Sequence, residues 1–367
     1  MRICLVITEL DPGGAERALV QLACGLQERN IDVFVVSLKP LPHSSRRQLV
    51  DQLDEQGIPI TSLDIRNRLA FLRGAAALRD LLDTYQPDLV HSFLHHANIL
   101  CAMSWRRQQP WKLVAGYRVA DPSRWRSWLE KRYKRRWVHY TAVSEDVATH
   151  MENFGGIEAA SITTIPNGID IDRFRAAEPL SPEDLGTRND RRLLGFVGRL
   201  HPQKGLDSLL PHLSRLFDQL PEHDLVIVGD GPRQAALTTA ITNLGLEKRV
   251  LFSGWRDDIP NILAAMDILL LPSRWEGMPN VIMEAMASGL PVVSFDVHGV
   301  RELLGDKADD QVVRIDDYPA FCQKVSEIAT SNELAGELHR ANSTRIEYFS
   351  IPAMVDRHQQ LYDQLCP

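Results

Sequence analysis

The chain has 367 residues, of which 44% are hydrophobic and 24% charged, and its formal net charge at pH 7 is −7. This length corresponds to about two domains, and the balanced composition excludes a disordered or fibrous protein. No apolar run approaches the roughly 18 residues that span a bilayer, and the scattered cysteines argue against a disulfide framework or a zinc site. We therefore expect a two-domain protein of the reducing cytoplasm.

Short β-branched apolar runs alternate with longer amphipathic stretches from the N-terminus onward, where we expect a first strand and no signal peptide. This alternation is typical of βαβ units and predicts doubly wound parallel sheets. The strands predicted in the first half are 3–8, 33–38, 58–63, 89–91, 112–116 and 139–142. Those predicted in the second half are 193–197, 224–228, 250–252, 268–272, 291–294 and 311–313.

A Pro-rich polar segment over 176–184 separates the two halves and is typical of a linker. We therefore predict one domain over 1–177 and a second over 178–350. Because open α/β sheets bind ligands beyond the carboxyl ends of their strands, the loops that follow the strands are the expected place of the chemistry.

Gly13 and Gly14 stand between the first predicted strand and a helix that we expect to start near Ala15. Glycines at such a place let an anion or a sugar approach the backbone N–H groups of the helix N-terminus. The pair is not the dinucleotide-binding fingerprint, because the pattern GxGxxG is absent. A tight turn without a ligand stays open as the alternative.

Arg199 and Lys204 share the loop after the predicted strand 193–197. Two cations on one such loop suit a diphosphate, since Arg and Lys both form charge-assisted hydrogen bonds with phosphate oxygens. For this segment by itself, a pair of solvated surface charges is an equal alternative.

Two carboxylates flank the start of a helix that follows the fourth predicted strand of the second half. Pro279 is typical of the start of a helix, and the amides of 277–280 offer hydrogen bonds to an anion at its N-terminus. Glu276 precedes this helix. Glu284 lies one turn inside it, where a carboxylate can accept two hydroxyl hydrogen bonds from a diol such as ribose.

In their order along the chain, these segments resemble the motifs of the family 4 glycosyltransferases. Each motif is weak alone, but the ordered set is specific and covers most of the chain. The matching segments are Gly13-Gly14-Ala15-Glu16, Pro166-Asn167-Gly168-Ile169-Asp170, Gly198-Arg199 with Lys204-Gly205, Val228-Gly229-Asp230-Gly231-Pro232, and Glu276 with Glu284. The resemblance implies a GT-B fold: two facing, Rossmann-like, doubly wound α/β domains, with a C-terminal helix within 351–367 that crosses back onto the first domain.

The resemblance also implies roles for single residues. Arg199 and Lys204 would hold the diphosphate of a nucleotide-sugar donor, with UDP as the expected nucleotide. Glu284 would bind the ribose, Glu276 the donor sugar, and Gly14 would approach the diphosphate from the first domain. The set implied for the donor is Gly13, Gly14, Phe252, Gly277, Met278, Pro279, Asn280 and Glu284, and the catalytic set is His91, Arg199, Lys204 and Glu276.

The segment 90–98 resembles the family's histidine-containing loop, although Phe93 stands where many relatives have a second histidine. The sequence thus leaves open whether His91 or His96 lines the cleft, or whether either makes only a structural hydrogen bond. Arg118 also occupies a place where many relatives have histidine. Together with His96, it is a candidate contact for the acceptor or for phosphate.

Asp170-Ile171-Asp172 has the DxD form of a motif that binds a metal and a diphosphate in another glycosyltransferase fold. It follows a turn at the domain junction, however, and Arg199 with Lys204 already supplies positive charge to the diphosphate. We therefore expect that no metal or other cofactor is required. The resemblance implies front-side attack by the acceptor hydroxyl, with catalysis by positioning and by stabilisation of the departing diphosphate.

The segment 124–137 combines an aromatic stripe at helical spacing with a strong excess of Arg and Lys. A basic helix with interfacial aromatic residues is typical of contact with anionic lipid, which would place the protein peripherally on the inner face of the cytoplasmic membrane. The alternative is that the stripe packs into the first domain. Nucleic-acid binding is not expected, because no recognised module accompanies the segment.

These observations predict a retaining glycosyltransferase that moves a hexose or N-acetylhexosamine from a UDP-sugar to a glycan or lipid-linked acceptor in envelope or exopolysaccharide assembly. One alternative is another GT-B enzyme: a nucleotide-sugar 2-epimerase would form product without an acceptor, and a glycoside phosphorylase would require inorganic phosphate. The other alternative is a non-catalytic scaffold that binds a nucleotide-sugar or a lipid. A scaffold has no need to keep all of the predicted donor-binding charges.

Overall fold

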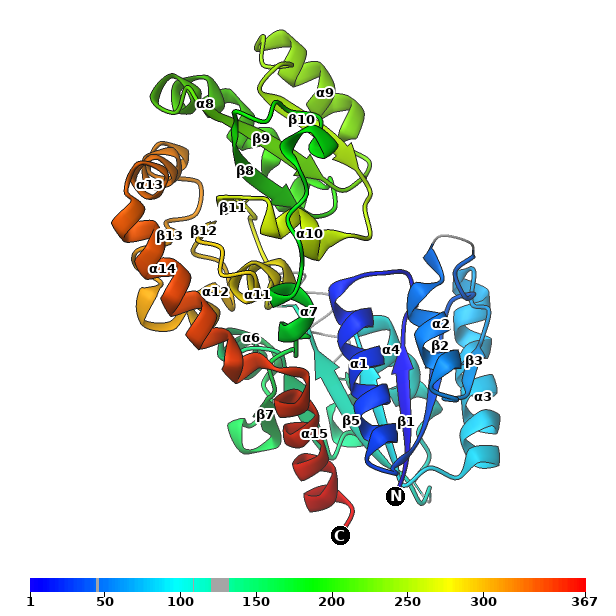
Figure 1. The fold of residues 1–367 in the computed structure, drawn as a ribbon. Coiled ribbons are helices and arrows are strands. Elements are labelled where there is room, and N and C mark those ends of the chain that lie inside the picture. The colour runs from blue at the N-terminus through cyan, green and yellow to red at the C-terminus, as the bar shows by residue number, and fades with distance from the viewer. Residues whose placement is uncertain (44–45, 108, 120–131) are drawn as a thin grey trace. The chain divides into compact units, whose positions relative to one another are not determined.

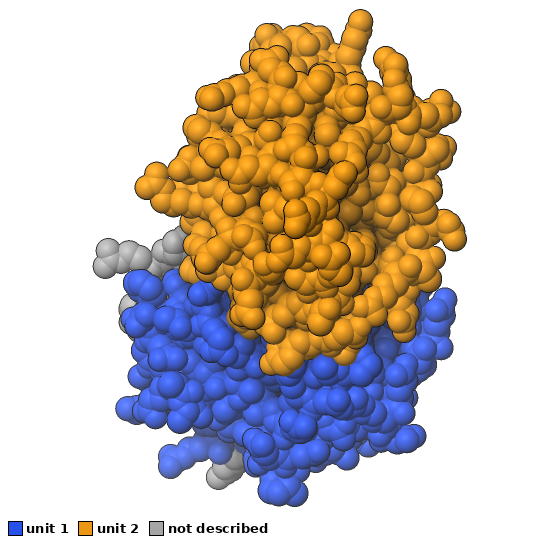
Figure 2. Space-filling view, turned by 60° about the vertical axis from the view of Figure 1, so that its left-hand side comes forward, with its two compact units in different colours: residues 1–168, 351–367 blue, residues 169–350 orange. Residues whose placement is uncertain are grey.

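The computed structural model describes residues 1–43, 46–107, 109–119 and 132–367, and Figure 1 traces their course. They form two units, coloured separately in Figure 2: unit 1 comprises Met1–Gly168 and Ile351–Pro367, and unit 2 comprises Ile169–Ser350. The chain thus enters unit 2 at residue 169, whereas the sequence placed the boundary at 177. The two boundaries differ because of α7 (Ile171–Arg175), which packs against α10 and α11 and therefore belongs to unit 2. This helix comes before the Pro-rich segment that the sequence suggested as the linker.

Unit 1 contains a parallel sheet of seven strands in the order β3-β2-β1-β4-β5-β6-β7. The six strands predicted in the first half are present. The seventh, β7, was not predicted, because its three residues form too short an apolar run. The strands are β1 (Arg2–Ile7), β2 (Asp32–Ser37), β3 (Ile60–Ser62), β4 (Leu89–Phe93), β5 (Lys112–Tyr117), β6 (His139–Ala142) and β7 (Ile162–Thr164). The helices are α1 (Gly14–Glu28), α2 (Gln48–Glu55), α3 (Arg68–Tyr85), α4 (His95–Ser104), α6 (Glu145–His150) and α15 (Ile351–Leu365), with short helical turns η2 (Lys134–Arg136), η3 (Met151–Gly155) and η4 (Ala159–Ser161).

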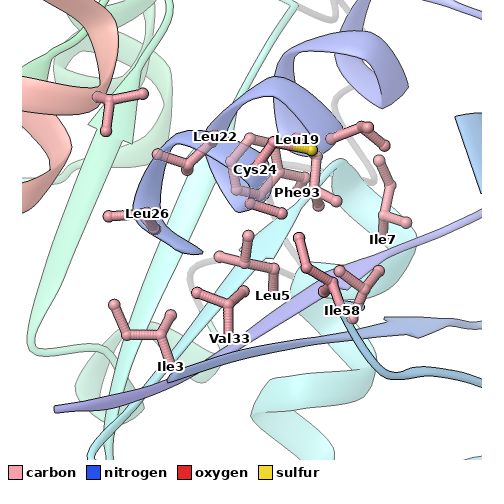
Figure 3. Packing of buried hydrophobic residues seen from close by; sticks show 14 of the residues in the cluster. Ile3, Leu5, Ile7, Leu19, Leu22, Cys24, Leu26, Val33, Ile58 and Phe93 are labelled. Carbon is pink, nitrogen blue, oxygen red and sulfur yellow. The ribbon is translucent and has the colours of Figure 1, made fainter. Parts of the chain in front are cut away.

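Helices cover both faces of this sheet, as the side chains of β1 show. Ile3, Leu5 and Ile7 lie in one buried cluster with residues of α1, α2 and α15, and Figure 3 shows the side chains of β1 and α1 pointing toward one another. Cys4 and Val6, which point to the opposite face, lie in a second cluster with residues of α3 and α4. A strand that is buried on both faces needs apolar residues at every position, which explains the unbroken apolar run of β1.

The C-terminal helix α15 occupies the predicted residues and packs against α1 of unit 1. Met354, Val355 and Tyr362 are among the side chains that it buries in the core. None of the helices within the described residues combines the length and the apolar composition of a bilayer span.

Unit 2 contains a parallel sheet of six strands in the order β10-β9-β8-β11-β12-β13, each at its predicted place. The strands are β8 (Arg192–Val197), β9 (His223–Val228), β10 (Val250–Gly254), β11 (Ile268–Leu271), β12 (Val292–Phe295) and β13 (Val312–Val313). Besides α7, the helices are α8 (Leu206–Gln219), α9 (Gln234–Asn243), α10 (Ile259–Ala264), α11 (Asn280–Ala287), α12 (Val300–Leu304), α13 (Tyr318–Thr330) and α14 (Asn332–Arg345), with short turns η5 (Pro182–Leu185), η6 (Pro202–Lys204), η7 (Gly305–Lys307) and η8 (Ile346–Phe349). Because β8 and β11 are neighbours, the loops after them emerge at the same edge of the sheet.

Candidate active site

The loops that follow β8 and β11 are joined to each other in unit 2. The backbone N–H of Arg274 donates to the carbonyl of Gln203 at 2.8 Å, and the Gln203 side-chain amide donates to the carbonyl of Trp275, also at 2.8 Å. Gly205, at the end of the first loop, has a φ of +70° and lies so close to Pro272 that a Cβ would stand 2.0 Å from the Pro272 carbonyl oxygen. A backbone hydrogen bond, the Gln203 side chain and the close approach at Gly205 therefore join the two loops.

Lys204 and Glu276 form an ion pair at this junction, with Nζ 2.6 Å from Oε1. The side chains are only 19% and 10% exposed, so water screens their attraction less than that of a surface pair. The resemblance assigned the two residues to different parts of the donor, the phosphate and the sugar. The structure brings them into direct contact, so a ligand that binds either residue also acts on the other.

Arg199 and Phe252 lie outside this ion pair. Arg199 follows β8 with its side chain exposed, and it forms no ion pair with the residues that the structure describes. Phe252 is half-buried in β10, the edge strand that is separated from β8 by β9. The exposed cation is available to a ligand at the carboxyl edge of the sheet.

The start of α11 is built as the sequence predicted. Asn280 is its first residue and Pro279, with an extended backbone, precedes it. Met278 and Glu284 are buried, with 6% and 7% of their surface exposed. Gly277, Asn280 and Glu284 each take part in at least one interaction in the structure.

In unit 1, Gly13 precedes α1 with an extended backbone, and Gly14 is the first residue of the helix. Glu16 belongs to the same motif, but the sequence assigns it no role. Its side chain is buried and folds back onto the loop, where a Cβ on Gly13 would lie 2.3 Å from Glu16 Oε2. Burial is the main reason that the pKa of Glu16 is raised to about 7; a hydrogen bond with its own backbone N–H and the charge of Arg118 lower it, and the charge of Glu9 raises it. The one sequence signal that could have pointed to a role for Glu16 is its position in the first turn of α1, where an acidic side chain is favourable.

His91 lies in the interior of unit 1 with both ring nitrogens in contact with hydroxyl groups. Nδ1 is 2.6 Å from the Tyr362 hydroxyl of α15, and Nε2 is 3.0 Å from Thr141 Oγ1 of β6. Burial, followed by the neighbouring His358, lowers the pKa of His91 well below its ordinary value. This geometry matches the structural alternative for His91 and gives no support to a catalytic role.

A cavity of about 1000 Å³ lies in unit 1, lined by residues that directly follow β1, β2, β4 and β5. It is therefore at the carboxyl edge of the sheet, where a ligand site is expected. His96 and Arg118 line it, together with His95 and His150, whereas His91 is not part of its wall. Of the two histidines that the sequence left undecided, His96 is the one that faces a cavity.

Arg118 is only 8% exposed. Its Nη1 donates to Asn167 Oδ1 at 2.5 Å, and its guanidinium carbon lies 4.3 Å from the centre of the Phe93 ring. Burial lowers the pKa of Arg118 to about 10, which leaves the group charged at neutral pH. The structure thus places Arg118 and Phe93 in a cation–π contact.

The described residues contain no group of three or more His, Cys, Asp or Glu side chains that could hold a metal ion. In the formal DxD segment, Asp170 has a structural partner, because its Oδ1 accepts a hydrogen bond from the backbone N–H of Arg173 at 3.1 Å. It thereby caps the N-terminus of α7.

Within the basic segment 124–137, residues 124–131 lie outside the described residues. Arg132, Lys134 and Arg135 are exposed. Trp137 packs against the core cluster that contains α3 and α4, as the packing alternative for the aromatic stripe predicts. Arg136 donates to the carbonyl of Ala102 and so belongs to the fold rather than to a free basic surface.

Each half of the chain matches a family model of glycosyltransferases. Residues 12–173 match the model of Glycosyltransferase Family 4, and residues 191–331 match that of Glycosyl transferases group 1. The UDP-Gal:alpha-D-GlcNAc-diphosphoundecaprenol alpha-1,3-galactosyltransferase of Escherichia coli is 32% identical over 56% of this chain and 55% of its own length. The 2-deoxystreptamine N-acetyl-D-glucosaminyltransferase of Streptomyces fradiae is 24% identical over 88% of this chain and 83% of its own length. The chain spans about half the length of the first of these relatives.

Solved structures share the fold of the whole chain. Anabaena HepE, determined in complex with UDP, has a TM-score of 0.83 at 23% identity and covers 99% of this chain and 100% of its own. The sucrose-phosphate synthase of Thermosynechococcus elongatus has a TM-score of 0.82 at 19% identity, with 100% and 99% covered. The two parallel sheets and these similarities show the expected two-domain GT-B α/β fold.

Proposed function

Because the chain belongs to the family 4 glycosyltransferases, we propose that it transfers a sugar from a UDP-sugar to an acceptor hydroxyl with retention of configuration. The observation that carries this function is the Lys204–Glu276 ion pair at the joined loops of β8 and β11. This pair places a cation and a carboxylate side by side at the carboxyl ends of the strands of unit 2. There the cation can bind a diphosphate while the carboxylate binds a sugar. The UDP complex of Anabaena HepE supports UDP as the nucleotide.

Chemically, the acceptor oxygen forms a bond to C1 of the donor sugar while the bond from C1 to the diphosphate oxygen breaks. The acceptor proton passes to a leaving phosphate oxygen. Lys204 and Arg199 stabilise the negative charge that develops on the diphosphate, and Glu276 orients the sugar. The reaction needs positive charge at the diphosphate. Because Lys204 and Arg199 supply that charge, we propose that no metal is required.

The acceptor that we propose is a glycan or a lipid-linked glycan of envelope or exopolysaccharide assembly. The E. coli relative, whose name includes a diphosphoundecaprenol acceptor, supports the lipid-linked form. We also propose peripheral contact with an anionic membrane through the exposed Arg132, Lys134 and Arg135. The protein is expected to co-sediment with anionic vesicles at low salt and to be released at high salt. Equal recovery with neutral vesicles would contradict this contact.

The donor site is tested by calorimetry of the full chain with UDP, GDP, ADP and their sugar conjugates. We expect the UDP compounds to bind, and Lys204→Ala to weaken their binding by about 10- to 100-fold, because a charge-assisted contact is lost. Turnover with a UDP-sugar is expected to survive EDTA. Activity that disappears in EDTA and returns with Mn²⁺ would overturn the metal-free mechanism. Product formed without any acceptor would instead identify a 2-epimerase.

A further inference from the structure

Arg274 lies in the loop after β11, two residues before Glu276, and its side chain contacts the segment that follows β8. Its Nη1 donates to the carbonyl of Pro202 at 3.1 Å, and its Nη2 donates to Ser208 Oγ at 2.5 Å. A side chain from the loop that carries Glu276 therefore holds the segment that carries Lys204.

These contacts lie on both sides of Lys204 in the sequence. Pro202 is the first residue of the short turn η6, which ends at Lys204, and Ser208 lies in the first turn of α8. A helical turn of 3 residues has too few hydrogen bonds of its own to keep its place, so contacts outside it determine where it lies. Lysine carries its charge on a flexible stem, and the position of the charge depends on where the backbone is held. Arg274 thus holds the backbone from which Lys204 reaches Glu276.

Asp207, also in the first turn of α8, adds charge to this set of contacts. Its Oδ2 lies 3.6 Å from Nη2 of Arg274 and 3.4 Å from Nη2 of Arg233, which belongs to the loop after β9. The side chains of Arg274 and Asp207 are 31% and 29% exposed, so water screens their attraction only in part. Asp207 thus connects the segment after β8 with the loops after β9 and β11.

Both terminal nitrogens of the Arg274 guanidinium are engaged by atoms of the protein. We propose that Arg274 is a positioning residue for the transfer reaction: it places the Lys204 ammonium beside Glu276 and thereby raises the affinity for the donor diphosphate, without contacting the donor itself. The inference rests on the proposed function and deepens it, because it makes the strength of the diphosphate site depend on a side chain of the Glu276 loop.

The test uses UDP as the probe and measures its binding to the full chain by calorimetry. We expect Arg274→Ala to weaken UDP binding about 3- to 10-fold, because Lys204 is displaced but not removed. In a Lys204→Ala background, the same substitution is expected to weaken UDP binding no further, since the residue that Arg274 positions is gone. Arg274→Lys retains the charge but not the fork of donors that reaches Pro202 and Ser208 together. Its UDP binding is therefore expected to stay weaker than that of the wild type.

Arg249→Ala is the matched control, because Arg249 also joins two segments of unit 2, but at the opposite, amino edge of the sheet. Its Nε lies 2.9 Å from Asp224 Oδ1, and its Nη2 donates to the carbonyl of Leu220 at 3.0 Å. We expect Arg249→Ala to lower Tm in differential scanning calorimetry and to leave UDP binding unchanged. Weaker UDP binding in Arg274→Ala but not in Arg249→Ala would therefore not be a consequence of lower stability.

Three outcomes would overturn the inference. The first is UDP binding in Arg274→Ala equal to that of the wild type. The second is a further loss when Arg274→Ala is combined with Lys204→Ala, which would show that Arg274 contacts the nucleotide directly. The third is wild-type affinity in Arg274→Lys, which would show that charge alone suffices; this variant also tests the inference where Arg274→Ala does not fold. Each of these results leaves the proposed function intact if UDP binding still depends on Lys204, whereas a wild-type protein that binds no UDP would refute the proposed function and the inference together.

Discussion

Replacing Lys204 by alanine is expected to lower kcat/KM for sugar transfer by about 10- to 100-fold, equivalent to roughly 1.5 to 3 kcal/mol of lost stabilisation. The substitution removes a cation from the departing diphosphate. It also leaves Glu276, whose side chain is 10% exposed, without its partner at 2.6 Å. Lys248, an exposed lysine of the same unit, provides the control, since Lys248→Ala should leave kcat/KM unchanged.

The ion pair also predicts how Glu276→Gln behaves alone and in combination. If Lys204 and Glu276 act as one unit, the double variant loses little more activity than the worse single variant, because each single change already breaks the pair. Steady-state kinetics of the four proteins measure this coupling. Fully additive losses would show that the two residues act independently, and no loss in Lys204→Ala relative to Lys248→Ala would refute the donor assignment.

Gly205→Ala is expected to destabilise unit 2 by about 3 kcal/mol, because two effects add. A residue with a side chain costs roughly 1 to 2 kcal/mol in the left-handed conformation that Gly205 adopts at a φ of +70°. The new Cβ would also stand 2.0 Å from the Pro272 carbonyl oxygen, and forcing the backbones apart costs about 1 to 3 kcal/mol. The corresponding fall in Tm is about 6 to 12 °C by differential scanning calorimetry.

Gly245 is the matched control for this substitution. Its φ of +68° is nearly the same, but a Cβ there would meet nothing within 4 Å. Gly245→Ala should therefore show the conformational cost alone and a clearly smaller fall in Tm. Equal falls in the two variants would mean that the contact between the β8 and β11 loops does not resist separation. Gly205→Ala should in addition weaken UDP binding, because it pushes apart the loops that carry Lys204 and Glu276.

Most of the fold could be predicted from the sequence. The unbroken apolar run of β1 is a local signal of a strand buried on both faces, and the run that becomes β8 carries the same signal. The exceptions were β7 and α7, whose three and five residues are too short for a periodic pattern. Both are held by their neighbours in the fold, β7 by pairing with β6 and α7 by packing on α11.

The sequence predicted which loops form the candidate site, but not which side chains in those loops contact one another. Parallel strands place their carboxyl ends at one edge, so loops carrying Lys204 and Glu276 could be expected near one another. Their direct ion pair joins residues 72 positions apart and could not be expected from either motif. The burial of Glu16 was equally hidden, since a glutamate in the first turn of a helix carries no sign of what will cover it.

The sequence by itself determined the order of strands and helices, the two parallel sheets and the loops in which the chemistry lies, because periodicity and motif spacing are local properties of the chain. Only the tertiary structure showed where His91 and His96 lie. Tyr362 reaches His91 across 271 positions of sequence and engages it in the core, whereas His96, on the next helix, lines the cavity. Which side chains are buried, paired or exposed depends on residues far away along the chain, and local pattern does not record those contacts.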